Sequence, residues 1–221
     1  MTVDEPDLGL RNLTYALLVE LGRAPTAEEV ASRAGSRLDE VLAGWRRLHE
    51  QHAIVLGAAG ETLRMANPFS AATTPYRVHA DGRWWFANCA WDAFGVCAAL
   101  HVDGRIETTC PDCGEAIGID VRDGRPGDES LLFHCLVPAA RWWDDIVFTC
   151  GAMNLFRSEE HIARWLAGRE PGATIPVTTL ADLAVAWWHD RLAPDWRPHT
   201  RDENQGILDG LGLKAPFWRL P

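Results

Sequence analysis

Cysteine and aspartate side chains in the segment NCAWD (residues 88–92) are the first candidates for chemistry in this 221-residue chain. We expect Asn88 to cap a helix that runs towards Leu100, which would put Cys89 in its first turn. The free amide groups and the dipole of that turn favour a reactive thiolate. Asp92 would share the helix face and could take a proton from the sulfur or return one. The structural alternative is a small buried cysteine beside an acid that stabilises the helix.

Cys150 lies at the end of the apolar run DIVFTC (residues 145–150). The length and apolar character of this run predict a strand. Gly151 would allow the backbone or a ligand to approach closely, but an isolated cysteine of this kind is more often a buried core residue. Taken alone, this segment indicates no function.

The segment CPDCG (residues 110–114) has the form of a zinc knuckle, with thiolates from Cys110 and Cys113. A structural zinc site needs four ligands, and a second pair with knuckle spacing is not evident in the sequence. A reduced dithiol, a simple strand turn and a relay for soft metal ions are the alternatives. Candidates for a second pair are His134 with Cys135, and Cys97 with His101.

Apolar spacing in residues 10–66 predicts three helices, over residues 10–21, from residue 26 onwards and over residues 38–52, followed by two short strands around Gly57 to Gly60. This order is typical of a winged helix-turn-helix, so DNA recognition and helical packing are both open. Phosphate binding needs uncompensated cations, so we favour packing and expect no nucleic-acid partner. The third helix mixes basic with acidic side chains: Arg37, Arg46 and Arg47 with Asp39, Glu40 and Glu50.

The remainder of the chain predicts a second part with an α+β fold, a mixed or antiparallel sheet with flanking helices. A turn at Asp81-Gly82 joins two strands, glycines punctuate the next ones, and SLLFHCLV adds another. Ser158 is expected to start a helix, and residues 179–192 to form another. We therefore divide the chain into a winged-helix-like portion, residues 1–75, and an α+β catalytic domain with a C-terminal extension, residues 76–221.

Composition excludes several classes of function. With 21 basic and 31 acidic side chains the formal net charge is -10, so no global field attracts polyanions. Acids at the N-terminus argue against an export signal and for a cytoplasmic protein, and Asn88 and Asp92 argue against a membrane span over residues 86–102. The chain has no GxGxxG, P-loop, HExxH or GxSxG motif. Three tryptophan doublets among 11 tryptophans indicate core packing or, alternatively, an aromatic wall for an apolar substrate.

Cys89 and Asp92 in NCAWDAFG, the CPDCG segment, and Cys150 followed by LFRSEEHIARWL together resemble the alkylmercury (organomercurial) lyase family over roughly residues 10–192. The resemblance implies that two cysteines and an aspartate cleave a carbon–mercury bond by protonolysis, with Cys89, Asp92 and Cys150 in those roles. It implies a structural role for Cys110. Two thiolates suit a soft ion such as mercury.

The resemblance also implies the reaction partners. The substrate would be a small organomercurial, the products a hydrocarbon and Hg(II) held by Cys89 and Cys150, and the acceptor of the ion free thiols or a mercuric reductase. No cofactor would be required. Cys113, Cys97 and residues 193–221 depart from the family pattern and indicate a divergent member. The alternatives are a lyase of the same fold with a non-mercurial organic substrate, and a metal-responsive DNA-binding regulator.

Overall fold

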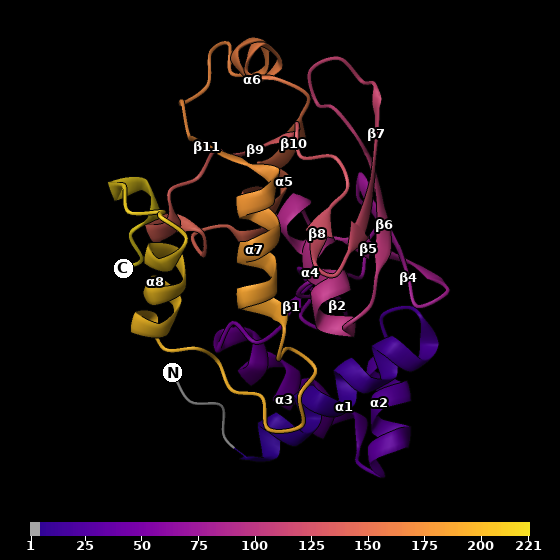
Figure 1. The fold of residues 1–221 in the computed structure, drawn as a ribbon. Helices are drawn as coiled ribbons and strands as arrows, with labels where there is room; N and C mark the ends of the chain where they lie inside the picture. The colour runs from indigo at the N-terminus through magenta and orange to yellow at the C-terminus, as the bar shows by residue number, and fades with distance from the viewer. Residues whose placement is uncertain (1–4) are drawn as a thin grey trace.

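The computed structural model describes residues 5–221, and its N-terminal part is a group of three helices with a small hairpin (Figure 1). The second helix begins where the sequence predicts it, after residue 26, and a capping box between Thr26 and Glu29 starts it. The three helices and the hairpin predicted for residues 10–66 are confirmed, while the winged-helix assignment stays a prediction. The elements are α1 (Glu5–Leu21), α2 (Ala27–Ala34), α3 (Leu38–Glu50), β1 (Val55–Leu56) and β2 (Leu63–Ala66).

Among residues 5–221 the larger sheet has eight strands in the order β1-β2-β3-β5-β4-β6-β7-β8, and every neighbouring pair is antiparallel. Buried and exposed residues alternate along β4 and β7, so one face of the sheet is covered by the core. Asp81 and Gly82, both with positive φ, form the predicted turn between β4 and β5. The further strands are β3 (Phe69–Ser70), β4 (Tyr76–Ala80), β5 (Arg83–Ala87), β6 (Gly104–Thr109), β7 (Ala116–Arg122) and β8 (Arg125–Pro126).

A second, three-stranded antiparallel sheet has the order β10-β9-β11, from β9 (Leu132–Cys135), β10 (Met153–Phe156) and β11 (Ala173–Pro176). The strand predicted for residues 145–150 is wrong: this run forms helix α5 (Ile146–Gly151). Asp145 caps the helix, because its side chain accepts a hydrogen bond from the amide of Phe148 at 2.9 Å. The strand begins only after the helix, at Met153.

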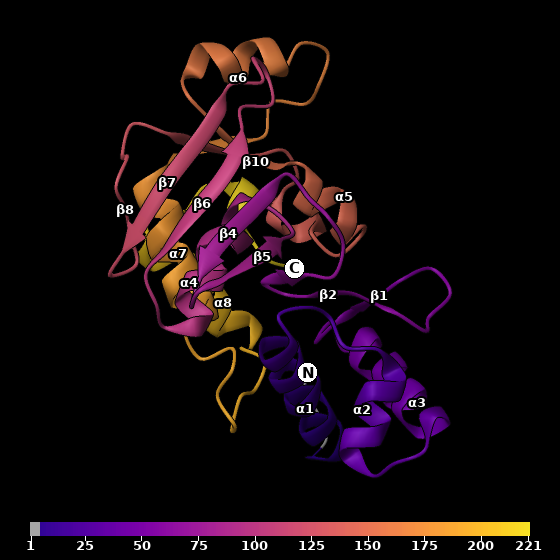
Figure 2. The same ribbon diagram turned by 90° about the vertical axis from the view of Figure 1, so that its right-hand side faces the viewer.

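Helix α4 lies between the larger sheet and α7, and Figure 2 shows the sheet in front of these helices. The close approach depends on Gly95 of α4, where a Cβ would come within 2.4 Å of the Trp188 ring. The predicted α+β fold is thus confirmed, with both sheets antiparallel. The remaining helices are α4 (Ala90–Leu100), α6 (Glu159–Trp165), α7 (Val177–Trp188), α8 (Arg201–Gly210) and two short 3₁₀ helices, η1 (Ala139–Arg141) and η2 (Pro216–Trp218).

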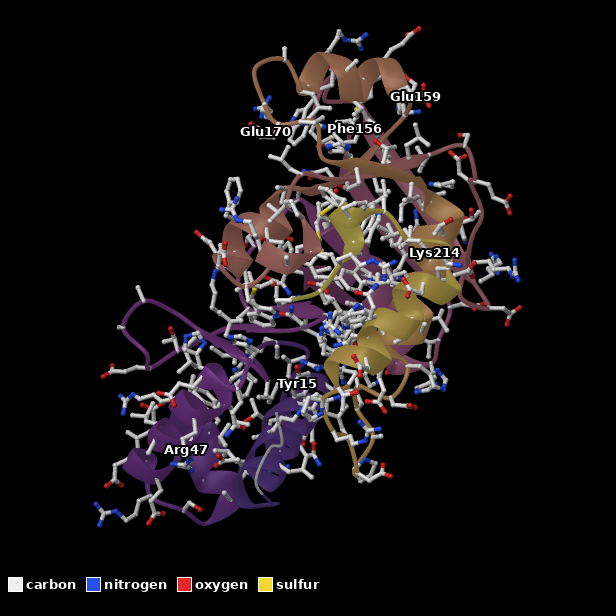
Figure 3. All side chains as sticks on the ribbon, turned by 90° about the vertical axis from the view of Figure 1, so that its left-hand side faces the viewer. Tyr15, Arg47, Phe156, Glu159, Glu170 and Lys214 are labelled. Carbon is white, nitrogen blue, oxygen red and sulfur yellow. The ribbon has the colours of Figure 1, made fainter. Side chains whose placement is uncertain are left out.

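Polar contacts join the N-terminal helices to the rest of the molecule around Tyr15, which Figure 3 labels where the two parts meet. Arg191 donates to the Tyr15 hydroxyl at 3.0 Å and to the Asn67 carbonyl at 2.9 Å. The larger sheet also continues across residue 75, since β3 pairs with β5. The division of the chain at residues 75 and 76 therefore stays a prediction. No helix within residues 5–221 combines the length and the apolar character needed to cross a membrane.

Candidate active site

The structure brings Cys89, Asp92 and Cys150 together although 57 residues of chain lie between Asp92 and Cys150. One ligand atom from each residue, two sulfurs and a carboxylate oxygen, lies within 4.8 Å of the other two. All three side chains are buried. Cys89 and Asp92 come from the start of α4 and Cys150 from α5, so three proton-carrying groups converge on one place in the core.

Cys89 is itself the N-cap of α4 and lies one residue before the first turn that the sequence predicts for it. Its extended backbone follows directly from β5, and its sulfur accepts a hydrogen bond from the amide of Asp92 at 3.4 Å. Asn88, the predicted cap, has a different role, because its side-chain amide donates to Oδ2 of Asp92 at 3.0 Å. The helix start thus fixes the thiol and the carboxyl group relative to each other.

Burial determines the protonation of this group. It raises the pKa of Cys89 well above the usual value, and the neighbouring Cys150 and Asp92 raise it further. The thiolate predicted from the helix dipole is therefore wrong for the protein without substrate, since desolvation outweighs the dipole. Burial also raises the pKa of Asp92 to about 7, although the hydrogen bond from Asn88 and the charge of Arg191 lower it. At neutral pH this carboxyl group can both hold and release a proton.

A cavity of about 60 Å³ lies beside these atoms. It adjoins a wider cavity of about 320 Å³ that also contacts Trp143, Trp187 and Trp188. The wall is apolar, so the predicted tryptophan doublets of residues 142–143 and 187–188 do line a pocket, whereas Trp84 of the third doublet is 44% exposed. Residues around the smaller cavity are Asn67, Cys89, Trp91, Asp92, Trp142, Trp143, Ile146, Cys150, Met153, Trp187 and Trp188.

The CPDCG segment forms a second group at the end of the β6–β7 hairpin. The donors of Cys110, Cys113 and His161 lie within 4.8 Å of one another. The third donor is thus a histidine of α6, and neither His134 with Cys135 nor Cys97 with His101 completes the group. Only the position of His161, after the predicted helix start at Ser158, could have pointed to it in the sequence.

Comparison with known proteins identifies the family. Residues 69–189 match the sequence profile of MerB, the alkylmercury lyases. The chain belongs to the alkylmercury lyase family. The resemblance inferred from the sequence is confirmed, and the protein is an enzyme of the alkylmercury lyase type that acts on a small-molecule substrate. The matched range contains both groups of cysteines and begins after the N-terminal helices.

The fold agrees with this family. The crystal structure of the mercury-bound form of MerB2 matches with a TM-score of 0.66 and 22% identity, over 86% of this chain and 93% of that chain. At this identity the match shows a shared fold. No curated protein matches the chain.

The three arginines considered for DNA binding lie in or beside α3. Arg37 pairs with Asp39 at 2.8 Å, and Arg47 pairs with the buried Asp7 at 2.7 Å. Partners of this kind leave less positive charge for phosphates. The absence of a nucleic-acid partner stays a prediction.

Proposed function

We propose that this lyase cleaves the carbon–mercury bond of small organomercurials with Cys89 and Cys150 as mercury-binding thiols and Asp92 as the proton donor. The observation that carries the proposal is the convergence of two sulfurs and one carboxylate oxygen within 4.8 Å. Mercury is a soft ion that prefers thiolates, and the bond to carbon is broken by a proton. The group therefore combines soft ligands for mercury with a donor for the proton.

The first step is the exchange of a ligand on mercury. The sulfur of Cys89 bonds to mercury and displaces the exchangeable ligand of the substrate, while Asp92 takes the thiol proton and passes it to the departing ligand. Metal binding makes this loss of a proton favourable despite the raised pKa of Cys89, because a coordinated thiol is deprotonated. A thiol that stays protonated until mercury arrives also has little affinity for harder ions.

The second step breaks the bond to carbon. Cys150 adds to mercury and gives its proton to Asp92, and the second thiolate increases the electron density on the bound carbon. Asp92 delivers the proton to that carbon, which keeps the electron pair of the broken bond. The products are the hydrocarbon and Hg(II) bound by two thiolates. Mercury stays in the same oxidation state, so we propose that the reaction requires no cofactor.

The pocket indicates the substrate class. Five tryptophan rings line the cavity, and Asp92 is its acidic side chain. An apolar alkyl or aryl group on mercury fits such a wall, whereas a carboxylate on that group would lose its hydration in an apolar pocket. We therefore propose neutral, apolar organomercurials as substrates, with the wider neighbouring cavity as their entrance.

Release of Hg(II) requires an acceptor with thiols, because two protein thiolates hold the ion tightly. We propose that free thiols or a mercuric reductase take the ion by thiol exchange through the wider cavity. Such acceptors are typical of the reducing cytoplasm, which we propose as the location of the protein.

The proposal is tested by incubating the purified protein with phenylmercury under excess thiol and measuring benzene release. We expect turnover by the wild type and none above background by Cys89→Ser or Cys150→Ser, since a hydroxyl is a poor ligand for a soft ion. Cys97→Ala is the matched control, because Cys97 is a buried cysteine of α4 that belongs to neither group. This control should retain turnover.

Two results would contradict the proposal. Benzene release by both serine variants at the wild-type rate would remove the cysteines from the reaction. No release by a folded wild-type protein would instead favour a non-mercurial substrate for the same site.

A further inference from the structure

The turn of the β6–β7 hairpin holds Cys110 and Cys113 in a defined loop. The amide of Gly114 donates to the carbonyl of Cys110 at 2.9 Å, and the amide of Cys110 donates to the carbonyl of Glu115 at the same distance. Gly114 has a φ of 74°, in the left-handed region that favours glycine. These contacts put both sulfurs on the same side of the turn, within 4.8 Å of a donor atom of His161.

His161 reaches the turn from α6. Ser158 caps this helix and accepts a hydrogen bond from the amide of His161 at 3.4 Å, which orients the first turn. Nδ1 of His161 lies 3.5 Å from Sγ of Cys110. Zinc–sulfur and zinc–nitrogen bonds of normal length, at a tetrahedral angle, place these two atoms about 3.5 Å apart. The distance between the side chains therefore suits two ligands of one zinc ion.

Asp112 contacts the histidine of this group. Its Oδ2 lies 3.1 Å from Nδ1 of His161, but it is not one of the donors that lie within 4.8 Å of one another. Arg164 contacts the same oxygen at 2.6 Å and holds the carboxylate next to the imidazole. The group thus offers two sulfurs and one nitrogen, and Asp112 orients the imidazole from outside it.

The environment of these thiols differs from that of the catalytic pair. Burial raises the pKa of Cys110, but amide groups of Cys113, Asp112 and Arg157 together outweigh it, and the pKa is lower than usual. Cys113 is exposed, so an ion can enter from solvent.

We infer that Cys110, Cys113 and His161 bind one zinc ion, with a solvent molecule at the fourth position next to the exposed Cys113. This site is separate from the proposed catalytic pair and does not depend on it. The ion would join the end of the β6–β7 hairpin to α6, two segments that Figure 1 shows side by side at the top of the molecule. An imidazole beside two thiolates suits zinc better than mercury, which is satisfied by two soft ligands. A zinc ion also occupies two thiols that would otherwise bind the Hg(II) product.

The test measures metal content by mass spectrometry in protein purified after growth with zinc and without chelators. We expect one zinc ion per chain in the wild type and in Cys97→Ala. We expect loss of at least ~90% of the zinc in Cys113→Ser and in His161→Gln, since each removes a ligand. Circular dichroism of each variant checks that it is folded.

Cobalt provides a second readout that does not depend on activity. Wild-type protein in which Co²⁺ replaces zinc should show the visible absorption of a tetrahedral site and a sulfur-to-cobalt charge-transfer band. Both should disappear in Cys113→Ser and persist in Cys89→Ser. The inference would be overturned if the wild type contains no zinc after purification and shows neither absorption band when Co²⁺ is added. So would zinc that is lost from folded Cys89→Ser and kept by folded Cys113→Ser, because the ion would then belong to the catalytic pocket.

Discussion

Two pairs of cysteines in this molecule have the same side-chain chemistry and different surroundings. Cys89 and Cys150 lie in the core beside tryptophan rings, where burial keeps the Cys89 thiol protonated. Cys110 and Cys113 lie at the end of a hairpin, where amide groups lower the pKa of Cys110. The first environment suits thiols that ionise only when a soft substrate binds, and the second suits permanent ligands of a metal ion. Burial acts on both Cys89 and Cys110, and the additional amide groups at the sulfur of Cys110 separate the two roles.

The largest expected effect concerns the carboxyl group of Asp92. Asp92→Asn removes the proton donor from the buried pair, and we expect benzene release to fall by ~10²–10⁴-fold, the usual contribution of a general acid or base. Attachment of the organomercurial to Cys89 should be slower but still occur, because the departing ligand can take the thiol proton directly, and mass spectrometry of the trapped complex can show it. Asp120→Asn is the matched control, because Asp120 is an exposed aspartate of β7 that pairs with Arg105. Equal turnover in the two variants would exclude Asp92 as the donor.

The next effect concerns the reactivity of the thiols. In protein treated with a chelator we expect iodoacetamide to modify Cys113 at least ~10²-fold faster than Cys89 or Cys150, because alkylation requires an accessible thiolate. Peptide mass spectrometry gives the rate for each site. In zinc-loaded protein Cys113 should also be protected from iodoacetamide, because the ion occupies its sulfur. Rapid labelling of Cys89 in the folded protein would contradict the account of the buried pair.

The sequence predicts one of these groups better than the other for physical reasons. Cys89 and Asp92 are three residues apart, so a helix start is enough to bring them together. A resemblance to a family was needed to add Cys150, because the apolar run before it fits a strand as well as a helix. The structure shows that Asp145 caps this run at its N-terminus and stabilises it as a helix. His161 was missed because only the folded chain places α6 beside the hairpin turn.

Most elements with a local signal agree with the structure. The capping box at Thr26, the turn at Asp81-Gly82 and the helix start at Ser158 each depend on residues within four positions of one another. The order of strands in the larger sheet depends instead on contacts distant in the sequence, such as the pairing of β4 with β6 across α4. Local chemistry therefore gave the elements, and tertiary packing determined how they form the two sites.

A moderate effect is expected on stability when zinc is removed. If the ion is present at 100 times its dissociation constant, it stabilises the folded state by ~2.7 kcal/mol. For a chain of this size the melting temperature should fall by roughly 5–10 °C after chelation. Differential scanning calorimetry of wild type and His161→Gln, with and without chelator, measures this change. A chelator effect of equal size in the two proteins would show that the stabilising ion is bound elsewhere.

The smallest effect tests whether burial acts on a cationic group as it acts on the thiols. Burial lowers the pKa of His134 from 6.5 to about 4, the opposite direction from Cys89, because in both residues it disfavours the charged form. Between these two pH values the unfolded chain binds a proton at His134 that the folded protein does not. The contribution of this residue to stability is therefore complete above pH 6.5 and decreases as the pH falls towards 4.

His134→Gln removes this titration and isolates it from that of Asp92, whose raised pKa acts in the opposite direction. Urea unfolding of both proteins from pH 7 to pH 4 gives the difference in their free energies of unfolding. We expect the free energy of unfolding of the wild type to fall by on the order of 1–2 kcal/mol relative to the variant over this range. A difference that does not change with pH would mean that burial does not control the protonation of His134, and it would weaken the same explanation for the buried thiols.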